Sequence, residues 1–252
     1  MGTPVLAIEN LTKEFDEIRA LDGISLSLNR GEILGLVGPN GSGKTTTMKL
    51  ILGLIRPASG SISINGLSLR ENFERAILPV RGIVETPKFY PYLSALDNLK
   101  ITFRMYPTAD WKNVEHFIEV FGLTKRIKDH VSQYSMGMKQ RLALCNAMIG
   151  SPEILLLDEP TNGLDVDAVL EFRDLIHTIN KENGVSVIFS SHILSEIERI
   201  CTRAAVINRG KIVADYSFTD RTSQPEAKSK DSFEDEYIRL SKTTGGINEE
   251  PV

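Results

Sequence analysis

A glycine-rich segment, GPNGSGKTTT at residues 38–47, directly follows the apolar run 33–37. Backbone N–H groups can converge on a triphosphate where side chains are absent, and a helix that starts there directs its positive dipole end at the same point. Lys44 then reaches the β- and γ-phosphates, and the Thr45 hydroxyl is a ligand for Mg²⁺. A glycine-rich turn that fits the pattern G-x-x-x-x-G-K-[ST] by accident is the alternative. The predicted nucleotide contacts are Gly38, Pro39, Asn40, Gly41, Ser42, Gly43, Lys44, Thr45 and Thr46.

Two adjacent carboxylates supply the second half of such a site. In ILLLDEP, Asp158 ends an apolar run and Glu159 follows it. We predict that Asp158 holds the metal through water and that Glu159 polarises the attacking water as a general base. Taken alone, LLLDEP is also compatible with a strand end that carries solvated acids. Together with residues 38–45, the pair predicts hydrolysis of a nucleoside triphosphate.

The elements that must position these residues are indicated by apolar periodicity. Continuous apolar runs, typical of strands buried on both faces of a parallel sheet, occur at 33–37, 154–157, 185–189 and 204–207. Alternating patterns, typical of antiparallel strands, occur at 5–9, 24–28 and 61–69, and the turn signals between them include Asp22-Gly23 and Asn65-Gly66. Helical patterns lie between the apolar runs, so the predicted class is α/β.

The chain divides into a main domain and a polar tail. Residues from about 93 to 149 have helical periodicity and no convincing strand, which predicts an inserted helical sub-domain. We predict one domain over residues 1–220 and a C-terminal extension over 221–252. The extension is polar, with one possible short helix at 233–240, and its last residues, TTGGINEEPV, are expected to be disordered.

Composition and charge disfavour several classes of protein, including nucleic-acid-binding, membrane-spanning and secreted proteins. A net charge of −4 gives no general attraction to nucleic acid or to an anionic membrane. The apolar runs fall well short of the roughly 20 residues that a membrane-spanning helix needs, and the N-terminus lacks a signal-peptide pattern. Cys145 and Cys201 belong to no metal-binding or redox motif, which indicates reduced structural thiols. These observations predict a cytoplasmic protein.

Three further motifs, VSQYSMGMKQRLAL at 131–144, NGLD at 162–165 and SSH at 190–192, complete a recognisable set. With them, residues 5–215 resemble the ATP-binding subunits of ATP-binding cassette (ABC) transporters, because five motifs occur in that family's order. The resemblance implies a P-loop NTPase core of the ABC type, with an antiparallel β sub-domain and an inserted α-helical sub-domain. It also implies ATP and Mg²⁺ as cofactors.

The resemblance further implies a head-to-tail dimer, either of two identical chains or with a second cassette. Each ATP would lie between the phosphate loop of one subunit, residues 38–45, and the signature segment of the other, within residues 131–144. A separate membrane permease is the expected partner, and the ATPase would be peripheral on the inner face of the cell membrane.

The signature segment contributes two residues by this resemblance. Ser135 and Gly137 would contact the γ-phosphate held by the partner subunit. The residues alone indicate an N-capped helix, in which Ser135 is the cap and the core positions are Met136, Met138 and Leu142.

Three more positions follow from the resemblance. His192 would contact the γ-phosphate and the attacking water, and Asp165 would join the two sites across the dimer, although it could equally cap the helix that follows. Phe15 would stack on adenine, with ordinary core packing as the alternative. The other histidines are read as ordinary surface or core residues: His116, His130 and His177.

Two departures from the family pattern are informative. Glu85, in RGIVETPKFYPYLSALDNL, stands where most members have the glutamine that contacts Mg²⁺ and water and adjoins the membrane partner. The signature reads YSMGM in place of Leu-Ser-Gly-Gly-Gln. The glutamate and the segment after it look most like the ATPases of exporters that give resistance or immunity to bacitracin and lantibiotic peptides. The surface that couples to the permease is expected at 85–93, with Phe89, Tyr90 and Tyr92 either exposed there or buried.

Two other functions compete with transport. A cassette ATPase that acts on ribosomes or DNA usually has two cassettes in one chain, a long coiled-coil insertion or a basic arm, none of which this sequence contains, so no nucleic acid is expected as a partner. A nucleotide switch without turnover is disfavoured because the chain retains the hydrolytic set of Lys44, Thr45, Asp158, Glu159 and His192.

Overall fold

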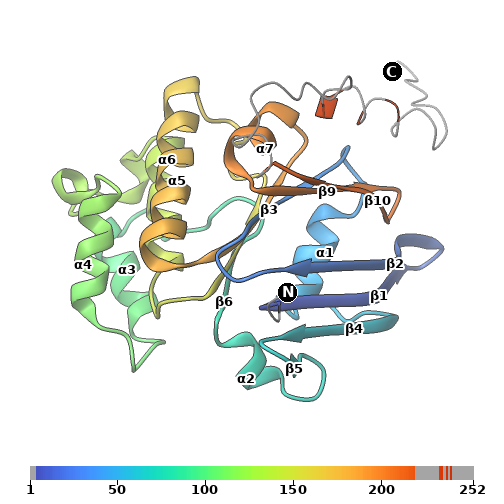
Figure 1. Ribbon diagram of the computed structural model, residues 1–252. Coiled ribbons are helices and arrows are strands. Elements are labelled where there is room, and N and C mark those ends of the chain that lie inside the picture. Colours follow the sequence, from blue (N-terminus) through green and yellow to red (C-terminus); the bar gives the residue numbers. More distant parts are fainter. Residues whose placement is uncertain (1–3, 219–232, 235–236, 238, 240–252) are drawn as a thin grey trace.

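Two β-sheets lie on either side of a short helix (Figure 1). The structure is a computed structural model that describes residues 4–218, 233–234, 237 and 239. Its strands are β1 (Leu6–Phe15), β2 (Ile18–Leu28), β3 (Ile33–Val37), β4 (Ser59–Ile64), β5 (Leu67–Ser68), β6 (Val80–Ile83), β7 (Ile154–Asp158), β8 (Ser186–Ser191), β9 (Arg203–Asn208) and β10 (Lys211–Ser217). Its α-helices are α1 (Lys44–Ile51), α2 (Phe73–Ile77), α3 (Ala95–Phe103), α4 (Trp111–Val120), α5 (Met136–Ala147), α6 (Val166–Asn183) and α7 (Leu194–Ile200). The 3₁₀ helices are η1 (Thr124–Arg126) and η2 (Val131–Gln133). The predicted α/β class is confirmed.

The larger sheet has the order β10-β9-β3-β8-β7-β6, and only the β9–β10 pair is antiparallel. Its central strands are buried on both faces, as their continuous apolar runs predicted. In β3, Leu34 and Leu36 face one hydrophobic core, while Ile33 and Val37 face the other. Strand β3, which leads into the phosphate loop, is therefore held from both faces in the interior of the sheet.

The smaller sheet is antiparallel, with the order β2-β1-β4-β5. Ile8 of β1 lies opposite Leu26 of β2 and Ile62 of β4, and all three side chains are buried. Met48 and Ile51 of α1 belong to the same core, so α1 is packed between the two sheets (Figure 1). The helix that follows the phosphate loop is thus fixed by apolar contacts on both sides.

One predicted turn is wrong. Asp22 and Gly23 do not separate two strands, because β2 runs continuously from residue 18 to 28 and the hairpin turn lies at Asp16 and Glu17. Gly23 takes a φ of +67° and its N–H donates to Thr12 Oγ1 at 3.2 Å. The side-chain oxygen satisfies the backbone group at an irregularity in the β1–β2 register, so the strand continues past it.

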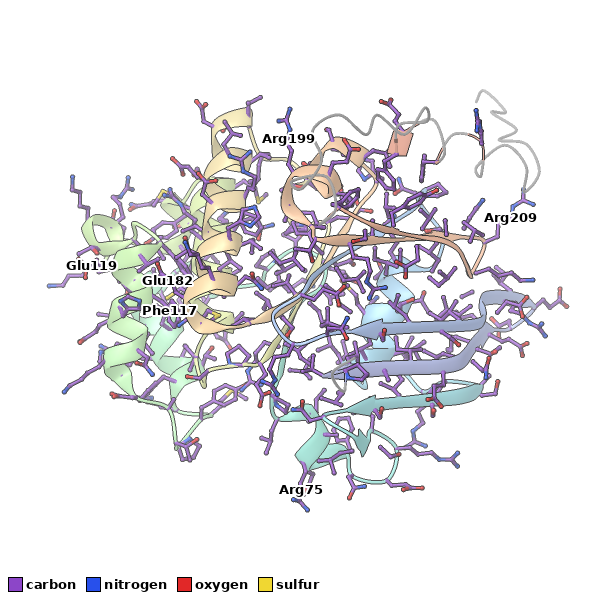
Figure 2. All side chains as sticks on the ribbon, in the orientation of Figure 1. Arg75, Phe117, Glu119, Glu182, Arg199 and Arg209 are labelled. Atoms are coloured by element: carbon purple, nitrogen blue, oxygen red, sulfur yellow. The ribbon has the colours of Figure 1, made fainter. Side chains whose placement is uncertain are left out.

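The predicted helical sub-domain is present. Residues 93–149 contain α3, α4, η1, η2 and α5, with a single isolated bridge between Ser94 and His130. These helices cover one side of the larger sheet, opposite the antiparallel sheet (Figure 1). Helix α4 buries Phe117 and exposes Glu119, both labelled in Figure 2.

The C-terminal part adds an unpredicted strand, β10, which pairs with β9. The described backbone at 233, 234, 237 and 239 is helical, in agreement with the short helix predicted at 233–240, and Phe233 is buried against Tyr216 and Phe218. The rest of the extension, including the tail expected to be disordered, lies outside the described residues. No helix within the described part of the chain is long and apolar enough to span a membrane.

Candidate nucleotide site

The phosphate loop connects β3 to α1, as predicted. A Cβ on Gly38 would lie 2.1 Å from the Ile207 carbonyl oxygen, so this position has no room for a side chain. Gly43 takes a φ of +115° immediately before α1, a conformation that favours glycine. The glycines therefore permit both the close packing of the loop and its sharp entry into the helix.

Lys44 is buried, with 4 % of its surface exposed. Its ammonium donates to the carbonyl oxygens of Gly38 at 2.8 Å and Pro39 at 3.2 Å, and it lies 3.1 Å from Glu159 Oε1. The loop thus holds the lysine in place, and the Glu159 carboxylate balances its charge. A phosphate that binds in the loop would compete with Glu159 for this ammonium.

Asp158 ends β7 and is buried. Its Oδ2 accepts from the Thr45 hydroxyl at 2.7 Å, and its Oδ1 accepts from the Ser190 hydroxyl at 2.8 Å. Thr45 and Asp158 therefore form a pair of hard oxygen ligands, which fits Mg²⁺ completed by water and nucleotide oxygens. Ser190 had no role assigned from the sequence. Its position at the start of the SSH motif was a usable signal.

Glu159 accepts from Asn162 Nδ2 at 2.6 Å and lies 3.1 Å from His192 Nδ1, in addition to its contact with Lys44. Burial of this carboxyl raises its pKa, but hydrogen bonds from Asn162 and Lys44 and the charges of Lys44 and His192 outweigh burial and leave the pKa below its ordinary value. Glu159 is therefore ionised at neutral pH, which is the form that a general base requires.

His192 follows β8 and is 41 % exposed at its side chain. Because the Glu159 carboxylate can only accept, Nδ1 of His192 must carry the proton of their hydrogen bond. In the neutral ring this leaves Nε2 as an acceptor. The pair can therefore accept both hydrogen bonds of one water, whereas a phosphate oxygen needs Nε2 to carry a proton as well. His116, His130 and His177 are exposed, which agrees with their reading as ordinary residues.

Glu85 is placed differently from the two metal-ligand candidates. Its carboxylate accepts from Lys49 Nζ of α1 at 2.7 Å, and its side chain is 60 % exposed. The hydrogen bond and charge of Lys49 lower the Glu85 pKa. Contact of Glu85 with a metal remains a prediction. Lys49, its partner, was not found from the sequence, because nothing in a helix pattern indicates which distant loop a lysine will face.

The signature segment begins α5. Ser135 accepts from the Met138 N–H at 3.2 Å and is confirmed as an N-cap. Met136 is 41 % exposed, so its predicted core position is wrong: it lies in the first turn, before α5 enters the core, whereas Leu142 is fully buried. Met138 is partly buried.

The same region contains a cavity of about 310 Å³ that is lined by Ser135, Gly137 and Asp165, among others. Asp165 Oδ1 accepts from the Ala168 N–H at 2.8 Å and caps α6, as one of its two readings predicted. The cavity lining contains no residue of the phosphate loop. Gln140, which had no assigned role, joins α5 to the segment after Glu159 by donating to the Pro160 carbonyl at 2.6 Å.

Aromatic residues mark two surfaces. Phe15 is 44 % exposed and lies under the Lys13 ammonium, so the alternative of core packing is wrong. Tyr90 and Tyr92 are also exposed, while Phe89 is partly buried. A groove of about 470 Å³ runs along residues 81–89 and against α5. Contact of Phe15 with adenine stays a prediction.

Comparison with known proteins places the chain among transport ATPases. Residues 21–162 match the sequence profile of the ABC transporter family. The chain is 42 % identical over 226 residues to the uncharacterized ABC transporter ATP-binding protein YdbJ of Bacillus subtilis, covering 89 % of this chain and 73 % of that protein. It is 38 % identical to the bacitracin transport ATP-binding protein BcrA of Bacillus licheniformis, covering 85 % and 70 %. It is 37 % identical to the lantibiotic transport ATP-binding protein SrtF of Streptococcus pyogenes, covering 85 % and 91 %.

Solved structures agree. An ATP-binding subunit of an ABC transporter superposes with a TM-score of 0.80 at 29 % identity, covering 94 % of this chain and 99 % of the other. A dimeric bacterial ABC transporter cassette superposes with a TM-score of 0.76 at 25 % identity, covering 84 % and 98 %. The predicted fold, a P-loop core of the ABC type, is confirmed by these likenesses.

Proposed function

The chain belongs to the ABC transporter family as an ATP-hydrolysing subunit, and from this premise we propose that it powers the export of antimicrobial peptides through a separate membrane permease. We place the ATPase domain at residues 1–220 and propose that it lies peripherally on the inner face of the cell membrane. The observation that carries the hydrolytic part is the convergence of Lys44, Glu159 and His192 on one point beside the phosphate loop.

Lys44 changes partner when nucleotide binds. In the structure its ammonium neutralises Glu159, and we propose that it transfers this interaction to the β- and γ-phosphates. The backbone N–H groups within residues 38–46, where Pro39 has none to offer, bind the remaining phosphate oxygens, and Phe15 stacks on adenine. Thr45 and Asp158 would hold Mg²⁺, which supplies charge neutralisation at the phosphates when bound.

Glu159 is then the general base. Release of Lys44 removes one of the interactions that lower the Glu159 pKa, so nucleotide binding raises the proton affinity of this carboxylate. A water between Glu159 and the γ-phosphate passes its proton to the carboxylate as its oxygen attacks phosphorus and ADP leaves. His192 keeps its Nδ1 proton on Glu159 and, as a neutral ring, accepts a hydrogen bond from the attacking water at Nε2; a contact from Nε2 to the γ-phosphate requires the protonated ring, in which Nε2 donates.

A second copy of the chain, or a second cassette, completes the site. The cavity at Ser135, Gly137 and Asp165 is lined by residues outside the phosphate loop of its own chain. We propose that Ser135 and Gly137 close over the γ-phosphate held by the partner, and that Asp165 connects the two sites. The dimeric cassette among the solved relatives supports this arrangement.

One observation supports the export of peptides and another supports coupling to a permease. Two relatives are named as transport ATP-binding proteins for bacitracin and a lantibiotic. The segment that begins at Glu85 lines a groove, and the exposed rings of Tyr90 and Tyr92 follow directly in the chain. We propose that the groove and these rings form the surface to which a permease segment binds.

The test uses the chain with Glu159→Gln, tagged and expressed in its native host. Membranes are solubilised with ATP present, and co-purifying proteins are identified by mass spectrometry. Stoichiometric recovery of a polytopic permease, together with increased sensitivity of the strain to bacitracin or a lantibiotic, supports the proposal. Recovery of ribosomal proteins or DNA-binding factors without a permease would contradict it and favour a soluble machine.

A further inference from the structure

The turn between β9 and β10 packs against the phosphate loop. The Gly210 N–H donates to the Ser42 carbonyl oxygen at 2.9 Å, and the Gly210 carbonyl oxygen accepts from the Asp22 N–H at 2.8 Å. Figure 2 labels the neighbouring Arg209 at the outer end of this hairpin. One residue of the hairpin thus bridges the phosphate loop and β2.

The bridge controls a peptide plane that matters for phosphate binding. The Ser42 carbonyl and the Gly43 N–H belong to one planar peptide group and point in opposite directions. A hydrogen bond that fixes the carbonyl therefore fixes the direction of the N–H at the start of α1. Donors that are aligned before the ligand arrives bind it without a cost of reorganisation.

The atoms around the contact between Gly210 and Ser42 are closely packed. A Cβ on Gly43 would lie 2.6 Å from Leu21 Cδ2 and 3.0 Å from the Ala20 carbonyl oxygen. A Cβ on Gly210, whose φ is +74°, would lie 2.7 Å from the same Ala20 oxygen and 2.9 Å from Leu21 Cα. The atoms that a Cβ on Gly210 would meet belong to the backbone of β2, so the hairpin would have to move away from the strand.

The hairpin is also tied to β2 by charge. Lys211 Nζ lies 3.1 Å from Asp22 Oδ2, beside the backbone bond from Asp22 to Gly210. Asp22 therefore holds the turn through both its main chain and its side chain. A displaced turn would lose these contacts together with the one to Ser42.

We propose that Gly210 is a positioning residue of the nucleotide site, which acts by holding the Ser42–Gly43 peptide in its phosphate-binding orientation. The inference rests on the proposed nucleotide site. It assigns a role in ATP binding to a hairpin about 170 residues along the chain from the loop that it supports.

The test compares Gly210→Ala with Gly66→Ala in the full-length chain. Gly66 has nearly the same φ, +75°, and no atom lies within 4 Å of the place that its Cβ would take, so both variants carry the same backbone strain. Binding of MgADP is measured by calorimetry, and melting temperature is measured alongside. We expect Gly210→Ala to raise the Kd for MgADP roughly tenfold or more, equivalent to about 1.4 kcal/mol, with Gly66→Ala unchanged. Equal Kd values in the two variants would overturn the proposal.

A second measurement needs no variant. If Gly210 favours nucleotide binding, nucleotide binding must stabilise the contacts of Gly210 by the same free energy. Hydrogen exchange on the parental chain should therefore slow at residues 208–211 when MgADP is added and stay constant at the Asn65-Gly66 turn. Unchanged exchange at 208–211 with MgADP bound would overturn the inference while leaving the nucleotide site intact. Failure of the parental chain to bind MgADP would contradict both.

Discussion

At the scale of single residues, ion pairs and hydrogen bonds to two adjacent carboxylates hold the site together. Glu159 holds Lys44 and His192, while Asp158 holds Thr45 and Ser190. The carboxylates and the lysine were predictable because motif spacing identifies them in the sequence. Lys49 was not, because its partner depends on how a distant loop is brought to α1, and Ser190 was overlooked although it opens the SSH motif.

The contact between Lys44 and Glu159 gives a prediction about binding. In Glu159→Gln the phosphate no longer competes with a carboxylate for the Lys44 ammonium, so MgADP should bind more tightly by roughly tenfold or more, in line with about 1.5–3 kcal/mol for hydrogen bonds to charged groups. Glu153→Gln, which alters an exposed ion pair with Arg30, is the control. Calorimetry checks this, and weaker binding in Glu159→Gln would contradict the proposed exchange of partners.

Glu85 gives a second prediction at this scale. Glu85→Gln and Lys49→Met each remove the ion pair, and because both side chains are partly exposed we expect little change in melting temperature. If Glu85 acts only through Lys49, both variants should change the rate of ATP hydrolysis alike. If Glu85 instead contacts metal or water independently of Lys49, Glu85→Gln alone should change kcat. Parental kcat values in both variants would exclude a role for this residue in turnover.

At the scale of elements, sequence patterns identified the strands that are buried on two faces and missed those whose position depends on a partner. The run 33–37 is β3 to the residue, because every side chain of that strand is buried. Strand β10 was missed because its side chains are exposed or half-buried in mixed order and its pairing with β9 defines it. The Asp22-Gly23 pair was misread because local turn chemistry was outweighed by the β1–β2 ladder.

Two substitutions at Asp165, the N-cap of α6, distinguish capping from coupling of the two sites. Asp165→Ala removes the acceptor for the Ala168 N–H and should cost about 1 kcal/mol of stability, or roughly 2–4 °C in melting temperature. Asp165→Asn keeps a good N-cap and should retain the parental melting temperature. If Asp165 also couples the two sites, Asp165→Asn will still lower ATP hydrolysis. Full activity in the Asn variant would restrict Asp165 to capping.

At the scale of the whole molecule, one sheet separates two cores. The first core lies between the larger sheet and helices α3 to α7, and the second encloses α1 between the sheets. The helix that follows the phosphate loop is therefore anchored in one core and the signature helix α5 in the other. Composition could predict a chain large enough for such cores, but the contact of the β9–β10 hairpin with the phosphate loop depends on the assembled fold.

The two cysteines report on the first core. Burial raises the pKa of Cys145 to about 12 and that of Cys201 further, so both thiols are protonated at about pH 8. We expect no alkylation by iodoacetamide in the native protein at this pH and rapid alkylation of both after unfolding in urea, measured by intact mass. Labelling of the native protein at the rate of a free thiol would contradict the packing of the core.

If ATP joins two copies of this nucleotide site and Glu159 then releases them by hydrolysis, blocking the base should trap the dimer. The most direct measurement is the molar mass of purified Glu159→Gln by light scattering with MgATP and with MgADP, beside its ATPase rate. We expect a doubled mass with MgATP only and hydrolysis reduced by at least about 100-fold, the lower range for loss of a general base. A variant that stays monomeric with MgATP would contradict closure between two copies of this chain, and one that hydrolyses ATP at the parental rate would contradict Glu159 as the base.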